Sequence, residues 1–185
     1  MSVRDCIKTA QDHLRNIVHD VHGATAIETA LVLTPFALLI FGIIEVSVLY
    51  LGAISLEDAV ASAGRQIRTG TIQNSAGVGE AGLTAFRTIF CGEVAAVVSC
   101  NNNLTIIVQS FASFDDVNFT APLIDPVTGE LVANSFNPGG AGTINLIRVA
   151  YSYDIMTPLL SQYLGDGSTG SKVLEASTVI RNEPF

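Results

Sequence analysis

The sequence predicts an α+β protein in which a long N-terminal membrane helix extends into a small domain with one further helix and an antiparallel sheet of about three strands. Three observations support this class. The longest apolar run lies near the N-terminus, an apolar stripe at helical spacing continues it, and strand-forming residues come late in the chain. We therefore expect a polar segment at residues 1–23, a membrane helix at 24–54, an amphipathic extension at 55–70 and a domain at 71–185.

The membrane helix is predicted from length and polarity. Residues 29–44 are all uncharged, and the apolar character resumes after Glu45. A helix over residues 24–54 would be about 46 Å long, which exceeds the roughly 30 Å hydrocarbon core of a bilayer. No other apolar run is long enough, so we expect one crossing and the lipid bilayer as a partner. A cleaved secretory signal is the alternative, but its apolar region is usually about 7 to 15 residues long and begins earlier.

The orientation of the crossing is only weakly encoded by charge. Arg4, Lys8 and Arg15 precede the run, and Arg65 and Arg68 follow it. Because the basic counts on the two sides are similar, the positive-inside rule gives a slight preference for a cytoplasmic N-terminus.

The helix is expected to continue beyond the membrane as an amphipathic extension. Leu56, Val60, Ala63 and Ile67 recur at intervals of four, three and four residues, and the charged residues lie off this stripe. We expect the stripe to pack on the domain that follows.

The domain contains one helix signal and three strand signals. After a break at residues 70–79, which contains Gly, Ser and Asn, a second helix is expected from about Glu80 to Ala96. The strand candidates are rich in β-branched or alternating apolar residues, and they are Leu104–Phe111, Ile144–Asp154 and Val173–Arg181. Residues 112–142, with several Pro and Gly, are expected to form a long loop with one hairpin around Asp125–Glu130.

Charge and cysteine content narrow the class of partner. The formal net charge is −8, and residues 1–23 hold three basic and three acidic side chains, so the negative charge resides in the rest of the chain. No nucleic-acid partner is expected, because phosphate binding needs clustered Lys and Arg. In an oxidising compartment Cys91 and Cys100 can form a disulfide, while Cys6 stays a thiol. Two buried, unpaired cysteines remain the alternative.

The residue types argue against an enzyme and against a metal or cofactor site. All three histidines, His13, His19 and His22, lie before the apolar run, and Lys172 is the one lysine after it. A histidine-based triad or a common zinc site therefore has no components in the later domain. Asp115 and Asp116 are adjacent, but their surroundings lack the spacing of an EF-hand loop. We expect no catalysis, no cofactor and no metal.

Two glutamates interrupt the apolar helix. A carboxylate at the centre of a membrane helix costs roughly 2.5 to 3.5 kcal/mol, so Glu28 either lies near an interface or has a positive partner. It can also favour the positive end of the helix dipole if it lies in the first turn. Glu45 follows seventeen residues later, on a face rotated by roughly 100°, so one partner surface is not expected to satisfy both. We interpret Glu45 as an interface marker or a subunit contact.

Taken together, these segments resemble the TadE-like minor pilins of tight-adherence (Flp) pilus systems. The resemblance rests on four features, which are Gly23-Ala24-Thr25-Ala26-Ile27-Glu28 with the apolar helix after it, Glu45, the triplet Ala63-Gly64-Arg65, and the closing Arg181-Asn182-Glu183-Pro184-Phe185. It implies a leader at residues 1–23, removed between Gly23 and Ala24 by a membrane aspartic prepilin peptidase. It also implies one inner-membrane span, with the N-terminus cytoplasmic and the C-terminal domain periplasmic.

The resemblance implies a structural role in initiating a pilus or forming its tip. The expected partners are the prepilin peptidase, other Tad/Flp pilins and minor pilins, and the inner-membrane assembly platform. Glu28 would neutralise the new α-amino group of Ala24 in the same or a neighbouring subunit, and Cys6 and the histidines would be absent from the mature protein. A signal-anchored periplasmic binding or adhesin module, with residues 115–142 as its recognition loop, is the alternative.

Overall fold

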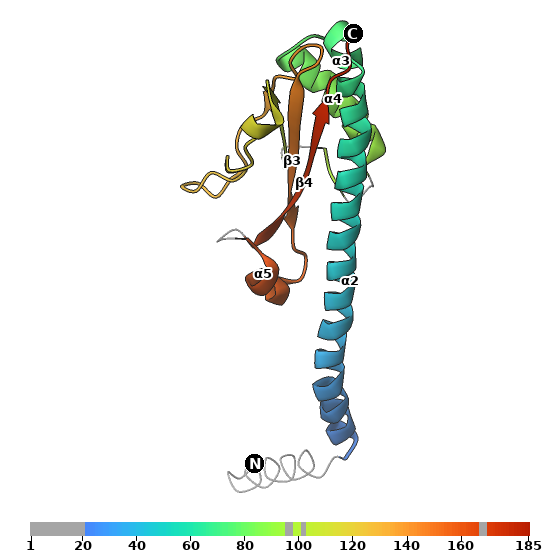
Figure 1. The fold of residues 1–185 in the computed structure, drawn as a ribbon. Helices are drawn as coiled ribbons and strands as arrows, with labels where there is room; N and C mark the ends of the chain where they lie inside the picture. The colour runs from blue at the N-terminus through green and yellow to red at the C-terminus, as the bar shows by residue number, and fades with distance from the viewer. Residues whose placement is uncertain (1–20, 95–97, 101–102, 167–169) are drawn as a thin grey trace, which may run out of the picture. The chain divides into compact units, whose positions relative to one another are not determined.

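The computed structural model describes residues 21–94, 98–100, 103–166 and 170–185. The chain divides into two compact units, Met1–Ile43 and Ile44–Phe185. The second unit combines helices with a mixed four-stranded sheet, which confirms the predicted α+β class (Figure 1).

The described part of the first unit is the beginning of helix α2 (Val21–Arg68), which continues into the second unit. Its side chains from Thr25 to Phe36 are exposed, among them Leu31 at 72%. The hydroxyl of Thr34 donates to the Ala30 carbonyl at 2.7 Å, one residue before Pro35, which has no N–H to offer the helix. Among the described residues this is the one helix long and apolar enough to cross a membrane.

The second unit begins with the remainder of α2, and the predicted apolar stripe faces its core. Leu56, Val60, Ala63 and Ile67 are each at most 1% exposed, so these four side chains lie in the core of the second unit. The helix ends where Gly70 adopts a left-handed conformation with φ of 72°, which glycine reaches without a Cβ clash.

Helices α3 and α4 come next in the chain. Helix α3 (Thr71–Ser75) lies inside the segment expected to be a break, because five residues are too few to show a helical period. Helix α4 (Glu80–Glu93) is the predicted second helix, and it ends three residues before the expected Ala96, since the backbone of Val94 is extended. Its buried face includes Phe86 and Phe90, both 0% exposed.

The sheet contains the three predicted strands and one more. Strands β1 (Leu104–Phe111), β3 (Ile144–Asp154) and β4 (Ser171–Arg181) form antiparallel pairs, β1 with β3 and β3 with β4. The additional strand β2 (Ser135–Phe136) pairs with β1 in parallel, giving the order β2-β1-β3-β4. The sheet is therefore mixed and four-stranded, and not the purely antiparallel sheet of about three strands that the sequence predicts. The sequence does not reveal β2, because a two-residue strand has no period.

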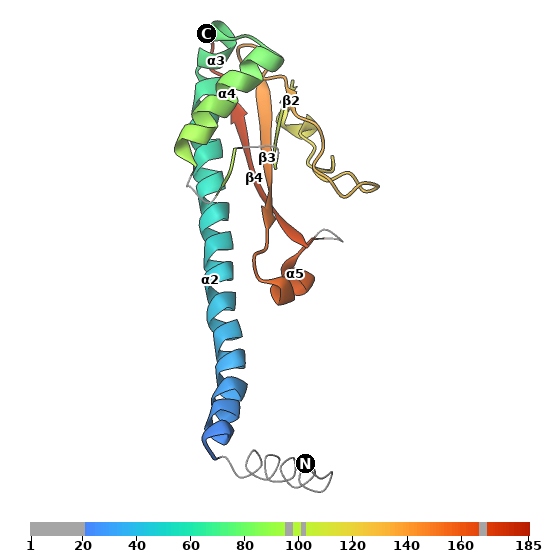
Figure 2. The same ribbon diagram turned by 180° about the vertical axis from the view of Figure 1, so that it is seen from behind.

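The two faces of the sheet have different covers. One face packs against α2 and α4, as the two opposite views agree (Figures 1 and 2). Alternate side chains of each strand point to this face. Among them are Ile106, Val149 and Ala176, which lie at paired positions on β1, β3 and β4. The segment between β1 and β2 covers the other face, where Leu146 is 1% exposed.

That segment is a long loop, as expected, and it is tied to the sheet. It contains a 3-10 turn, η1 (Phe114–Asp116), and a hairpin in which Asp125 N–H donates to the Glu130 carbonyl at 2.8 Å. The hydroxyl of Thr105 in β1 donates to the Val132 carbonyl at 2.8 Å. The predicted hairpin is thus confirmed.

A short helix, α5 (Pro158–Leu164), lies in the connection between β3 and β4 and was not expected from the sequence. It stands at the end of the sheet opposite α3 and the C-terminus (Figure 1). The unit therefore has one end at α5 and another at α3.

Candidate functional site

The junction expected to be processed lies within helix α2. Gly23 and Ala24 have helical backbone, and the helix already includes Val21, so Glu28 lies beyond the first turn of the described helix. Glu28 is exposed, and within the part of the chain that the structure describes its carboxylate has no hydrogen bond or ion pair. A carboxylate so placed is available to a group from outside the described chain.

Glu45 lies in a different environment, although it belongs to the same helix. It is only 5% exposed. Its Oε1 accepts hydrogen bonds from the Tyr153 hydroxyl and the Met156 N–H, both at 3.1 Å, and its Oε2 accepts one from the Thr157 hydroxyl at 3.0 Å. We call this group of four residues the Glu45 latch, because it joins α2 to the end of β3 and the start of α5.

The latch changes the interpretation of Glu45. From the sequence, Glu45 is expected to be an interface marker or a subunit contact, whereas the structure places its carboxylate in hydrogen bonds within one chain. A contact with another subunit would have to replace these bonds.

The latch also affects Tyr153. Burial of the phenol raises its pKa above the ordinary value of 10, and the hydrogen bond and negative charge of Glu45 raise it further. Tyr153 is thereby kept as a neutral donor to the carboxylate.

The triplet Ala63-Gly64-Arg65 marks a close approach of α2 to the sheet. Ala63 and Gly64 are buried, while Arg65 is exposed. A Cβ on Gly64 would lie 3.3 Å from Cδ1 of Ile147 in β3, so the absence of a side chain lets helix and strand pack closely.

The C-terminal motif lies at the end of the unit that is opposite α5 (Figure 1). Asn182 is 3% exposed, and its amide donates to the carbonyls of Pro138 at 3.0 Å and Gly140 at 2.9 Å. The N–H of Glu183 donates to the carbonyl of Arg68, the last residue of α2, at 2.9 Å. The closing residues therefore connect the end of α2 to the loop before β3, a structural role that no local pattern in the sequence predicts.

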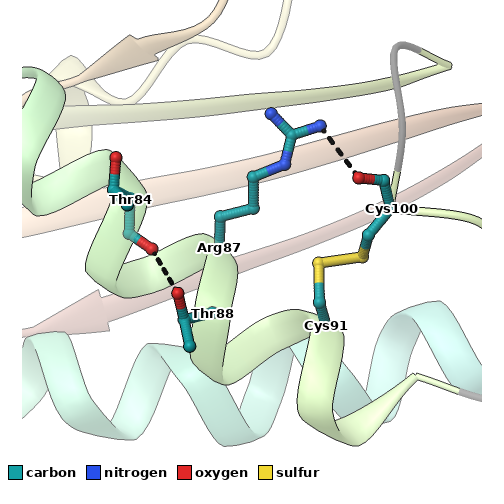
Figure 3. The surroundings of a disulfide bond; sticks show 5 residues. All are labelled: Thr84, Arg87, Thr88, Cys91 and Cys100. Atoms are coloured by element: carbon teal, nitrogen blue, oxygen red, sulfur yellow. Dashed lines mark hydrogen bonds between the residues drawn. A yellow bond between two sulfur atoms is a disulfide. The ribbon is translucent and has the colours of Figure 1, made fainter.

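The cysteine pair forms a disulfide within the domain. Cys91 in α4 is bonded to Cys100, with their Cα atoms 6.0 Å apart (Figure 3). Arg87, one turn earlier in α4, donates to the Cys100 carbonyl at 3.4 Å. The bridge fixes the last turn of α4 to the segment that leads into β1.

The acidic side chains of the described residues do not gather into a metal site. No group of three or more His, Cys, Asp or Glu residues that could hold a metal occurs among them. Asp115 and Asp116 lie in η1, where the Asp115 N–H donates to the Ser113 hydroxyl at 3.3 Å, so they form part of a solvated turn. Cys6, His13 and His19 lie outside the described residues, and for His22 only the helical backbone is described.

The comparisons with known proteins add one match. The family model described as TadE-like protein matches residues 23–65. Neither a curated protein nor a solved structure matches the chain. The matched segment begins at Gly23, includes Glu28 and Glu45, and ends at Arg65, the last residue of the triplet Ala63-Gly64-Arg65. The chain therefore carries a TadE-like segment over residues 23–65, where the predicted resemblance to the TadE-like family is confirmed.

Proposed function

We propose that this protein is a minor pilin or pseudopilin that takes part in initiating a tight-adherence pilus or forming its tip. The observation that carries the proposal is the TadE-like match over residues 23–65, which starts at the residue where processing is expected. A TadE-like segment suggests a pilin associated with the Tad pilus.

The proposed processing step has a chemical rationale. Cleavage of the Gly23–Ala24 peptide bond by a prepilin peptidase would create an α-amino group on Ala24, which is positively charged below a pKa near 8. Glu28 has no partner among the described residues, so its carboxylate can neutralise that amine in the same or a neighbouring subunit. In a low-dielectric environment the pair compensates two charges that are each costly alone.

The exposed beginning of α2 supports a membrane anchor. We propose that residues 24–44, a shorter stretch than the 24–54 expected from the sequence, cross the hydrocarbon. They include the exposed Leu31, Leu39 and Ile43, and as a helix they would span roughly 31 Å, close to the hydrocarbon thickness of about 30 Å. The compact unit that contains the domain begins at Ile44, so the span fits between the junction and that unit. We place the anchor in the bacterial inner membrane before assembly.

The cysteine bridge supports a periplasmic domain. Disulfides persist in oxidising compartments such as the bacterial periplasm and are rare in the cytosol, and Cys91 is bonded to Cys100. With the domain in the periplasm, the N-terminus is cytoplasmic. The partners we propose are the prepilin peptidase, other Tad/Flp pilins and minor pilins, and the inner-membrane assembly platform.

A second candidate function is a signal-anchored periplasmic binding or adhesin module. The observation that favours it is the hairpin around residues 125–130, where Val127 is 91% exposed at the tip of a loop tied to the sheet. Deletion of the hairpin tip separates the two functions, because an adhesin would lose attachment while pili still form. An assembly subunit that depends on this loop would instead lose the pili.

The N-terminus of the mature protein tests the proposal. We expect intact-mass measurement, on protein from cells that carry the peptidase, to show loss of residues 1–23 and a new N-terminal Ala24. The matched control is Gly23→Leu in the same cells, which should stay at full length. A wild-type chain that remains uncut in peptidase-positive cells would contradict the proposal.

A further inference from the structure

An exposed apolar patch lies at the α5 end of the domain. Met156, Leu159 and Tyr163 are 83%, 50% and 79% exposed. Their spacing of three and four residues places Leu159 and Tyr163 on one side of α5, with Met156 just before the helix. We call these three residues the α5 patch.

The Glu45 latch attaches this patch to helix α2 within the second unit. The Met156 N–H and the Thr157 hydroxyl both donate to the Glu45 carboxylate, so the start of α5 is attached to α2 at that residue. Glu45 is also the first charged residue after the uncharged stretch of residues 29–44. The patch is therefore attached to the helix at the point where the proposed membrane span ends.

The far end of α5 is held as well. The ammonium of Lys172 lies 2.7 Å from Asp166 Oδ1, and the Val173 N–H donates to Asp166 Oδ2 at 2.9 Å. Burial of Asp166 favours its neutral form, but the bonds from Lys172 and Val173 outweigh it and lower the pKa of the carboxyl below its ordinary value. The carboxylate stays charged at neutral pH, and α5 is fixed between two sets of polar bonds.

The side chains suit the boundary between lipid and water. Tyrosine is enriched at membrane interfaces, where its ring lies at headgroup level. The chain has four tyrosines and no tryptophan, and Tyr163 and Tyr50 are exposed, at 79% and 69%. Tyr50 lies five residues past Glu45, about 7.5 Å further along the helix, within the headgroup layer if the hydrocarbon ends near Glu45.

We propose that the α5 patch rests in the headgroup layer of the bilayer from which α2 emerges, so that the domain touches the membrane at a second point besides its helix. This inference rests on the membrane anchor of the proposed function. Exposed Asp154 beside the patch, together with Asp166, gives no attraction for anionic lipid. The contact is therefore apolar and aromatic, and it does not depend on the anionic lipid fraction.

Spin-label depth measurement tests the contact. The full chain with Cys6→Ser is reconstituted in vesicles of phosphatidylethanolamine and phosphatidylglycerol, with the native disulfide intact and one label at Leu159→Cys or Tyr163→Cys. The control is Val127→Cys, on the exposed hairpin tip, and Leu39→Cys reports on the span. We expect nickel-chelate collisions at 159 and 163 to be several-fold fewer than at 127, with no change when phosphatidylglycerol is varied.

Three other outcomes would contradict the proposed contact. If positions 159 and 163 are as accessible to nickel as 127 while 39 is protected, the patch contact is wrong and the anchor stands. If 39 is also accessible, the proposed anchor fails and the contact fails with it. If protection at 159 grows with the protein-to-lipid ratio, a second copy covers the patch, which also overturns the proposal.

Discussion

The two parts of helix α2 on either side of Ile44 bury their side chains very differently. Before it, Leu39 is 58% exposed and Glu28 is exposed without a partner among the described residues. After it, Leu56 is 0% exposed and Glu45 is 5% exposed, with three hydrogen bonds. The same residue types therefore contribute to the folded core in one part and stay exposed in the other.

One continuous helix can therefore have side chains in the core of a domain along one part and exposed side chains along the other. Substitutions of the side chains that are buried after Ile44 should change the stability of the domain. Substitutions before it should leave that stability unchanged and affect the membrane or the assembly. Matched substitutions in the two parts of the helix separate these two effects.

The largest expected difference comes from one leucine in each part. Leu56→Ala should lower the free energy of unfolding of the domain by about 3 kcal/mol, because it removes a fully buried side chain and leaves a cavity. Leu39→Ala should change it by less than about 0.5 kcal/mol, as is usual for exposed sites. Urea unfolding of the full chain in detergent, followed by circular dichroism, measures both. Equal losses in the two variants would remove the distinction between the parts.

Substitution of the two glutamates should also lower the free energy of unfolding more after Ile44 than before it, but by a smaller amount than substitution of the leucines. Glu45→Ala leaves the Tyr153 hydroxyl, the Met156 N–H and the Thr157 hydroxyl without their acceptor. Unpaired buried polar groups cost about 1 to 3 kcal/mol, so we expect a loss of that size.

Glu28→Ala is the matched control for this change and should leave the unfolding free energy within about 0.5 kcal/mol of wild type. Glu45→Gln retains an acceptor oxygen, so its unfolding free energy should lie between that of wild type and that of Glu45→Ala. A Glu45→Ala variant as stable as wild type would show that the latch contributes nothing to folding.

The smallest expected effect is a shift in a tyrosine titration. The pKa of Tyr153 is raised in the folded state by burial and then by Glu45. The contribution of the neutral phenol to the free energy of unfolding is therefore complete below pH 10 and is lost as pH rises through the raised pKa. Glu45→Gln should move the pKa partly back toward 10, because burial remains. Absorbance titration at alkaline pH, with Tyr153→Phe as the subtraction control, measures it. Ionisation of Tyr153 at or below the ordinary value would contradict the latch geometry.

Much of the domain could be predicted because its main elements have clear periods. The strands Leu104–Phe111 and Ile144–Asp154 were predicted to the residue, since β-branched or alternating residues fill them and turn residues bound them. The buried stripe from Leu56 to Ile67 likewise follows from its helical spacing. These signals are local, and local signals can be read from one sequence.

The remainder depends on contacts between residues far apart in the chain. Glu45 and Tyr153 are separated by 108 positions, and no spacing rule predicts their hydrogen bond. Helix α5 has only seven residues, with Pro158 at its start as the sole local signal. The sequence context of Glu28 predicts an assembly contact, and that prediction involves a partner outside the described chain.

The central claim is that Glu28 serves assembly while Glu45 serves the fold, and the amount of protein in sheared pili tests it most directly. Glu28→Ala should be processed to Ala24 and keep wild-type unfolding stability, yet be missing from the pilus fraction of cells that make the wild-type fibre. Recovery of Glu28→Ala in that fraction at the wild-type level would contradict the claim.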